Sequence, residues 1–259
     1  MTGHSHLMNR EETFHNQEIV AKAGFEANII ENHDQPRGAS LFIPEEDYGF
    51  YSLSALATII FCERGLPFLY QGQEIGMSNR QWKYDEFNDL ETINQYQIAL
   101  KAGMSKEQAL EIARHHSRDN ARTPMQWSSE ENAGFSKGKP WMPVNENYKV
   151  VNVAEEEKEY GSILNFYKRL IAFYKSEEYN EILTYGDFRP IYEKEDHIFA
   201  YSRSYGCQKL VLICNFSSKE KDIELSEDYE NVVFVNYEQT TVIGNTLKMK
   251  PYECVIYEM

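Results

Sequence analysis

The sequence predicts an α/β domain followed by a small antiparallel β-sandwich. Residues 25–31 and 66–71 are short apolar segments that each run into a polar loop, with a helical segment between them. This order is typical of parallel βα units. After about residue 180, apolar and polar residues alternate instead, as they do in half-buried antiparallel strands.

The elements of the first part follow from their composition and apolar pattern. Residues 9–23, rich in Glu, Gln, Ala and Lys, predict a helix. FEANIIE (25–31) predicts a strand buried on both faces, which ends in a loop that contains Pro and Gly. DYGFYSLSALATIIFCERG (47–65) predicts a helix, and LPFLYQ (66–71) predicts the second strand, followed by the polar loop GQEIGMSN.

Further helices are expected between residues 88 and 176. Two helical stretches fill 88–117, and the second opens at Ser105 with Gln108 three residues later, which is a capping-box pattern. Residues 157–176 predict an amphipathic helix, because apolar side chains recur at spacings of three and four.

The alternating runs near the C-terminus predict the strands of the β-sandwich, at 197–204, 209–217, 231–237, 246–250 and 253–259. We place the boundary at 180–185, which gives domains 1–182 and 183–259. Two parallel strands cannot close a sheet or cover both its faces. The first domain is therefore either a small unusual fold or the tail of something longer.

Composition and charge argue against several classes of partner. The 259 residues are 42% apolar and 26% charged, as in a folded globular protein, and no apolar run approaches the ~20 residues of a spanning helix. The net charge of −15 argues against nucleic acid and against anionic membrane surfaces. The first eight residues, which we leave out of fold reasoning, lack the apolar core of a signal peptide.

The cysteines and histidines give no sign of a metal site. Cys62, Cys207, Cys214 and Cys254 form no CxxC pair, so we expect reduced, mostly buried thiols in a cytoplasmic protein. His115 and His116 are adjacent on a predicted helix and point in different directions, which predicts a solvated helix end. The histidines at 4, 6 and 15 carry no ligand pattern either.

The loop ENHDQPR is the first candidate for chemistry. Asp34 could act as a general acid, a base or an electrostatic stabiliser, and His33 could bind a hydroxyl group. Arg37 could hold a carboxylate in a bidentate pair. The alternative is that these residues cap the loop and form a surface salt bridge.

SRDNARTPMQW (117–127) is the second candidate, with Arg118, Asp119, Asn120 and Arg122 close together. Its alternative is a structural ion-pair network, with Trp127 in the core. In QGQEIGM (71–77), loop hydrogen bonding by Gln71, Gln73 and Glu74 is the favoured interpretation. We find no phosphate-binding loop, dinucleotide fingerprint, HExxH or GxSxG motif.

Taken in order, FEANIIENHDQPRG, GLPFLYQGQEIGMSN and SRDNARTPMQW resemble glycoside hydrolase family 13, the α-amylase superfamily. The sequence is most similar to the branch of oligo-1,6-glucosidases, dextran glucosidases and trehalose-6-phosphate hydrolases, from about residue 10 to 259. The resemblance implies the C-terminal part of a (β/α)8 TIM barrel, with 25–31 and 66–71 as strands 7 and 8 and flanking helices, before the β domain. A complete barrel of this type takes ~200 to over 400 residues.

The resemblance also implies an α-glucoside oligosaccharide as substrate and assigns roles. Asp34 would stabilise the oxocarbenium-like transition state, and His33 would bind a hydroxyl of the same ring. Arg118 would contact the terminal glucose, while Arg37 and Asp119 would orient these groups. We expect no cofactor and no metal, because the family's calcium loop lies early in the barrel.

Retaining glycosidases need a nucleophile and an acid about 5–5.5 Å apart. By resemblance both lie upstream of residue 1, and the sequence offers no replacement. We therefore expect the C-terminal part of a retaining α-glucosidase for small, α-1,6-linked glucosides of the isomaltose and dextran type, inactive alone. The alternatives are a non-catalytic carbohydrate-binding remnant, or half of a split enzyme completed by a separate N-terminal half-barrel chain. Preference for 1,4 links, trehalose 6-phosphate or sucrose stays open.

Overall fold

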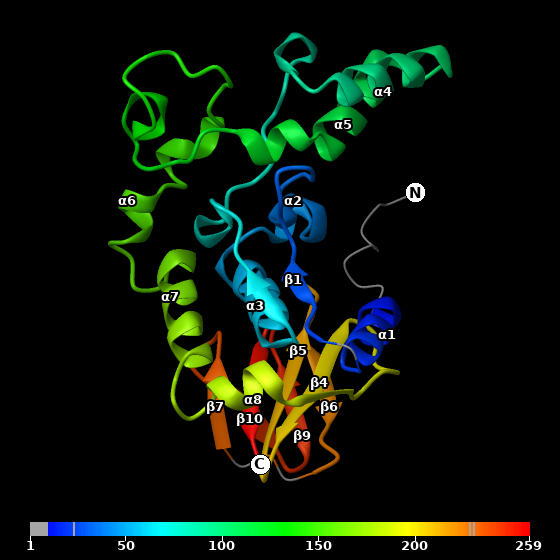
Figure 1. Ribbon diagram of the computed structural model, residues 1–259, viewed down its shortest axis with the longest axis vertical. Coiled ribbons are helices and arrows are strands. Elements are labelled where there is room, and N and C mark those ends of the chain that lie inside the picture. Colours follow the sequence, from blue (N-terminus) through cyan, green and yellow to red (C-terminus); the bar gives the residue numbers. More distant parts are fainter. Residues whose placement is uncertain (1–9, 23, 228, 230) are drawn as a thin grey trace. The chain divides into compact units, whose positions relative to one another are not determined.

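The computed structural model describes residues 10–22, 24–227, 229 and 231–259 (Figure 1). The expectations for the histidines at 4 and 6 and for the chain start lie outside these residues. Contacts divide the chain into two compact units. Among the described residues, the strand-rich unit comprises 10–29, Asp47–Phe68 and Phe166–Met259, and the helical unit comprises Ile30–Glu46 and Leu69–Asn165.

The two predicted βα strands are present in the strand-rich unit. β1 (Ala27–Ile29) pairs in parallel with β2 (Leu66–Phe68), and α3 (Phe50–Cys62) connects them in sequence. The prediction that the first strand is buried on both faces is wrong. Asn28 is buried, whereas Ala27 and Ile29 on either side are exposed. The Asn28 amide donates hydrogen bonds to the carbonyls of residues 60 and 63 near the end of α3, which turns its neighbours to the opposite face.

α3 is apolar around most of its circumference because it is buried on most sides. Its C-terminal carbonyls receive donors from the β-strands of the same unit. The Tyr201 hydroxyl donates to the carbonyl of Ile59 at 2.9 Å, and Arg203 Nη1 donates to the carbonyl of Cys62 at 2.7 Å. These bonds satisfy groups that a helix end leaves without an internal partner.

The C-terminal part of this unit forms two antiparallel sheets in the described residues, and the predicted turns Tyr205-Gly206 and Gly244-Asn245 form two of the hairpins. Five strands match the predicted runs, and β3, β6 and β8 were not predicted. The larger sheet has the order β3 (Asp187–Pro190), β4 (Ile198–Tyr205), β5 (Gln208–Asn215), β10 (Cys254–Glu258), β7 (Asn231–Val235). The smaller has the order β6 (Lys221–Glu224), β9 (Thr246–Met249), β8 (Thr241–Ile243).

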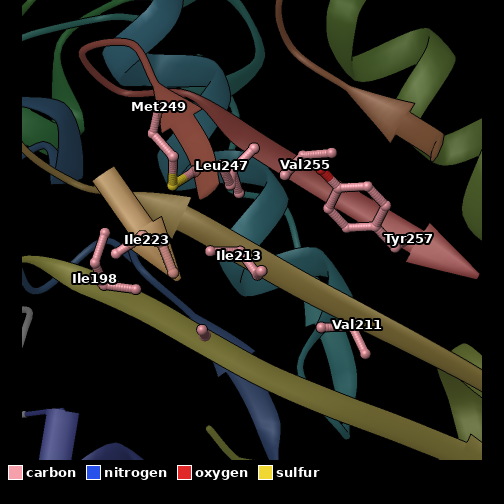
Figure 2. Close-up of a cluster of buried hydrophobic side chains, with 9 residues drawn as sticks. Ile198, Val211, Ile213, Ile223, Leu247, Met249, Val255 and Tyr257 are labelled. Atoms are coloured by element: carbon pink, nitrogen blue, oxygen red, sulfur yellow. The ribbon is translucent and has the colours of Figure 1, made fainter. Parts of the chain in front are cut away.

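The two sheets share one hydrophobic core, so the predicted sandwich is correct (Figure 2). Ile213 and Val255 of the larger sheet and Leu247 of the smaller are buried in the same cluster. Cys62, Cys214 and Cys254 are buried free thiols and Cys207 is exposed, as expected. The strand-rich unit also contains α1 (Arg10–Val20) and α8 (Asn180–Tyr185).

The helical unit is held by small local cores. Trp82, Phe87 and Met142 form one, and Met77 and Met125 belong to another. The predicted helices over 88–117 are α4 (Leu90–Lys101) and α5 (Lys106–His116), and Ser105 and Gln108 form the predicted capping box. The unit also contains α2 (Gly38–Phe42), α6 (Val153–Glu156) and the 3₁₀ helices Gln73–Ile75, Tyr84–Glu86, Arg118–Arg122, Glu131–Gly134 and Glu146–Lys149.

The last predicted helix is shorter than expected. α7 (Ile163–Tyr174) starts six residues after the predicted start at 157, because Glu156 and Ser162 hold the preceding turn. Ser162 donates to the Glu156 carbonyl at 2.6 Å, and the Glu156 carboxylate accepts the Leu164 amide at 3.2 Å. No helix within the described residues is long and apolar enough to cross a membrane.

Candidate active site

The site begins in the loop after β1, where a local turn brings His33 and Asp34 together. The Asn32 side-chain oxygen accepts the Asp34 amide at 2.8 Å, as in an Asx turn. His33 Nε2 lies 3.1 Å from Asp34 Oδ2. The two side chains are 72% and 53% exposed, so this pair faces solvent.

A buried ion pair between Arg37 and Glu31 holds the same loop in place. Arg37 Nη1 donates to Glu31 Oε2 at 3.1 Å and to the carbonyl of Gln71 at 2.7 Å. The Arg37 amide donates to Asn79 Oδ1 at 2.9 Å. Burial raises the pKa of Glu31, and the charge and hydrogen bonds of Arg37 oppose this rise. Arg37 therefore ties residues 31–37 to the loop after β2 rather than touching Asp34 itself.

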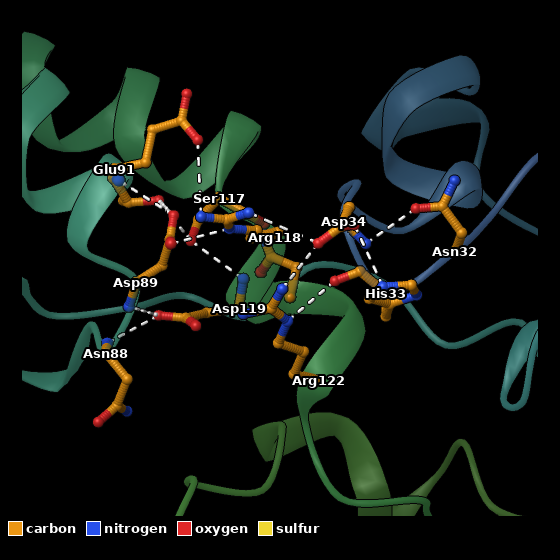
Figure 3. A network of polar contacts seen from close by, with 12 residues as sticks. Asn32, His33, Asp34, Asn88, Asp89, Glu91, Ser117, Arg118, Asp119 and Arg122 are labelled. Atoms are coloured by element: carbon orange, nitrogen blue, oxygen red, sulfur yellow. Dashed lines mark hydrogen bonds and ion pairs between the residues drawn. The ribbon is translucent and has the colours of Figure 1, made fainter.

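SRDNARTPMQW contributes the other side of the site. Ser117 caps the 3₁₀ helix Arg118–Arg122 by accepting the Asp119 amide. Arg122 donates from Nη2 to Asp34 Oδ1 and from Nε to the carbonyl of His33, both at 2.9 Å. Arg118 Nη1 lies 3.5 Å from the same Asp34 oxygen. Figure 3 shows Asp34 between His33 and these two arginines.

Besides Asp34, two carboxylates hold the guanidinium of Arg118, one at the N-cap of α4 and one within α4. Its Nε donates to Asp89 Oδ1 at 2.8 Å, and its Nη2 lies 3.6 Å from Glu91 Oε2. Burial raises the pKa of Asp89, but hydrogen bonds from Thr92 and Arg118 outweigh it, so the pKa lies below its ordinary value. The hydrogen bond and charge of Asp89 raise the pKa of Arg118. The guanidinium is thus held in place by a carboxylate that stays ionised.

Asp119 is a further carboxylate of this network, and it supports Arg118 indirectly. It is buried, and its Oδ2 accepts the amides of Asn88 and Asp89 at 2.7 and 2.9 Å. Both bonds fix the start of α4, where Asp89 meets Arg118 (Figure 3). Asp119 therefore influences Arg118 through the position of Asp89.

A cleft of about 370 Å³ opens beside these residues within the helical unit. Asp34 and Arg118 line one part of it, and Tyr96, Ile112 and His116 of α4 and α5 line another. Its size lies within the range of small-molecule sites. The lining thus combines charged and polar side chains with apolar ones, which suits a hydroxylated ligand with an apolar face.

Two residues of the network received no role from the sequence. Arg122 was recognised only as a member of its segment, and Asp89 was not singled out. Spacing gives no signal for Arg122, because a 3₁₀ helix has about three residues per turn and a side chain four positions after Arg118 points about a third of a turn away. Asp89 is an N-cap, and its side chain accepts the Thr92 amide. Its second contact, to Arg118, leaves no local pattern.

The remaining sequence candidates lie in structural positions. Glu74 accepts the Gly72 amide at 2.7 Å, in agreement with the interpretation of that segment as a hydrogen-bonded loop. His115 and His116 end α5, and their rings meet edge to face at 4.8 Å. Trp127 is 49% exposed rather than in the core. Within the residues described, no three His, Cys, Asp or Glu side chains gather in a way that could hold a metal ion.

Comparison with known proteins gives two family matches. The catalytic domain of α-amylase matches residues 3–186, and the C-terminal domain of the α-amylase SusG matches residues 198–256. The oligo-1,6-glucosidase of Bacillus cereus is 38% identical over 249 residues, which cover 94% of this chain and 44% of that protein.

Solved structures of the same kind are also similar. A Bacillus licheniformis trehalose-6-phosphate hydrolase gives a TM-score of 0.88 at 36% identity, over 96% of this chain and 46% of that one. An isomaltulose synthase from Erwinia rhapontici gives 0.87 at 32% identity, over 96% and 45%. These neighbours differ in the sugars that their names state. The chain spans less than half the length of the relatives that it matches.

Proposed function

The chain belongs to the α-amylase family of glycoside hydrolases, and from this premise we propose that it is the C-terminal part of a retaining α-glucosidase. Its substrates would be small α-glucosides, with α-1,6-linked oligosaccharides of the isomaltose and dextran type as first choice. The observation that carries this proposal is the half-exposed Asp34 carboxylate, which two arginines hold beside a cleft.

In this proposal β1 and β2 are strands 7 and 8 of a (β/α)8 barrel, within a domain over 1–182, and 183–259 form the C-terminal domain. The burial pattern of the strands supports it. Ile29, Leu66 and Phe68 are 44%, 50% and 53% exposed, although barrel strands normally bury such side chains. Further barrel strands would cover them.

Each polar residue has a role that its contacts permit. Asp34 keeps lone pairs that can accept hydrogen bonds from sugar hydroxyls and face developing positive charge. His33, which is more exposed than Asp34, would donate a hydrogen bond to a hydroxyl group of the same sugar ring. Arg118 would contact the terminal glucose, and Arg37 and Asp119 would position these groups. No cofactor enters this mechanism.

Asp34 cannot serve as both nucleophile and acid, since those roles require two carboxylates on different sides of the scissile bond. We propose that both come from a preceding polypeptide segment, in the same chain or in a separate N-terminal half-barrel chain. The free thiols support a cytoplasmic location. A carbohydrate-binding remnant is the second candidate, favoured by the internally satisfied network around Arg118 and Asp119.

The test is a chimera in which the part of the Bacillus cereus oligo-1,6-glucosidase that precedes its matched region is fused before this chain, since the chain matches 44% of that enzyme. The 259-residue chain should not hydrolyse p-nitrophenyl α-glucoside or isomaltose, whereas the chimera should. Asp34→Asn should abolish turnover by the chimera. Robust turnover by the chain alone would overturn its assignment as a part. A folded but inactive chimera that still binds isomaltose would favour the remnant.

A further inference from the structure

A second hollow in the helical unit shares no lining residue with the Asp34 cleft. It measures about 560 Å³, and Asp85, Asn88, Glu131, Asn132, Trp141 and Tyr148 contribute to its lining. We propose that this Trp141 hollow is a separate binding site for a neutral gluco-oligosaccharide. The choice of sugar as ligand rests on the proposed function.

Trp141 is the feature that calls for a ligand. It is 76% exposed, far more than the other tryptophans, since Trp82 is fully buried and Trp127 is half-exposed. An indole ring is costly to leave in water. Its electron-rich face attracts the weakly positive C–H groups of a pyranose ring, while its edge can take part in hydrogen bonding.

The backbone holds Trp141 in place although its side chain is exposed. Pro140 and Pro143 flank it closely, which limits the backbone angles on both sides. Met142 is fully buried in the cluster with Trp82 and Phe87. The carbonyl of Val144 accepts Arg80 Nε at 3.1 Å. The backbone that carries the ring is therefore held in place, which lowers the entropy cost of binding.

The facing wall contains an unusual backbone. Asn132, Ala133 and Gly134 have φ values of 54°, 57° and 66°, so three successive residues are left-handed, two of them not glycine. Such a turn is strained for Asn and Ala. The amides of Trp127 and Ser128 hold it by donating to the Ala133 carbonyl at 2.9 and 3.0 Å. This turn places Glu131 and Asn132 at the hollow.

The charges of the lining favour a neutral ligand. Glu86 is already paired with Arg80 at 2.6 Å. Among the lining residues that the structure describes, this leaves two negative charges, on Asp85 and Glu131, and one positive charge, on Lys139. A net negative hollow repels phosphorylated sugars. Exposed carboxylate oxygens can accept hydrogen bonds from the hydroxyl groups of a neutral sugar, and the Asn88 side-chain amide can donate and accept such bonds.

The chain itself provides matched variants for a binding test. So that binding at the Asp34 cleft is weakened, we would titrate the 259-residue chain carrying Asp34→Asn with isomaltotriose, and with trehalose 6-phosphate as the anionic probe, by calorimetry. Trp141→Ala should weaken isomaltotriose binding at least tenfold, while Trp127→Ala, the other exposed tryptophan outside the hollow, should change it less than twofold. Trehalose 6-phosphate should bind at least threefold more weakly than isomaltotriose.

A second measurement does not depend on truncating Trp141. In a Trp127→Phe background, acrylamide quenching of fluorescence reports mainly on Trp141, because Trp82 is buried. Isomaltotriose should protect this fluorescence, and Asp34→Asn should leave the protection unchanged. That last result separates the hollow from the active-site proposal, which is tested by turnover of the chimera instead. No protection, equal binding by the Trp141→Ala chain, or preference for the phosphorylated sugar would each overturn the inference.

Discussion

The buried pair Arg37–Glu31 gives the most direct test of how the Asp34 loop is held. We consider Arg37→Met, which keeps the length and apolar part of the side chain but removes its charge and donors. Glu31 then loses the guanidinium 3.1 Å away, and the carbonyl of Gln71 loses its donor at 2.7 Å. Both side chains of the pair are buried, so water cannot replace the lost partner.

The expected loss of stability is large. Removing one partner of a buried ion pair costs about 3–5 kcal/mol. Domains are stabilised by only about 5–15 kcal/mol in total. At roughly 2–4 °C per kcal/mol for a domain of this size, the melting temperature should fall by roughly 6–20 °C.

The pH dependence identifies the cause. Burial already raises the pKa of Glu31 in the native chain, and without Arg37 the pKa rises further. A carboxyl group with a raised folded-state pKa contributes stability that is complete below its unfolded pKa. That stability is lost as pH rises through the folded value. Arg37→Met should therefore recover part of its stability between pH 8 and pH 5, as Glu31 takes up a proton.

The assay is urea unfolding at pH 5 and pH 8, followed by circular dichroism. Lys158→Met is the matched control, because its ion pair with Glu155 is exposed at 2.8 Å and should contribute only about 0.2–0.5 kcal/mol. The double variant Glu31→Leu/Arg37→Met removes both charges and should regain most of the loss. A loss below 1 kcal/mol, or an equal loss at both pH values, would refute the reasoning.

Three further predictions concern other parts of the chain. Burial and the charge of Glu26, opposed by Arg203, raise the pKa of Glu63 to about 8, so stability should fall from about pH 4.5 to pH 8. Glu63→Gln should flatten that slope in melting curves at pH 5, 7 and 9, and an unchanged slope would contradict the assignment. Asp119→Ala leaves two amides without their acceptor and should cost about 1–3 kcal/mol in urea unfolding, and a cost below 0.5 kcal/mol would exclude the role given to Asp119. In the active chimera, Arg122→Lys should lower kcat about tenfold or more with a smaller change in KM, whereas Arg189→Lys, at an exposed position of β3, should not.

Much of the fold could be predicted because its signals are local. The capping box at Ser105, the helices over 88–117 and the five alternating strands depend on residues close in sequence. β3, β6 and β8 were missed because they are short and their residues do not alternate clearly between apolar and polar, as those of the predicted run 246–250 do. The burial of Asn28 and exposure of Ile29 could not be predicted, since they depend on which elements cover the sheet.

In the candidate site too, residues close in sequence could be predicted and contacts between distant residues could not. His33 and Asp34 stand out because an Asx-type turn brings adjacent residues to one place. Arg122 reaches Asp34 across 88 positions of sequence, and Arg118 reaches Asp89 across 29. Such contacts follow from tertiary structure, and a resemblance to a family can point to them only where the family's own roles are known.

The distribution of burial within the helical unit argues that the sugar-binding half of the proposed site is built before any catalytic partner arrives. Glu31, Arg37, Asp89 and Asp119 are buried, and each is paired or hydrogen-bonded inside this unit. Exposure is greatest instead on His33 and Asp34, and Arg118, the third side chain assigned to the sugar, is partly exposed. A site whose supporting residues are already satisfied can bind without rearrangement. In the proposed enzyme, the segment that supplies the nucleophile and the acid would therefore add chemistry to a preformed binding surface rather than create that surface.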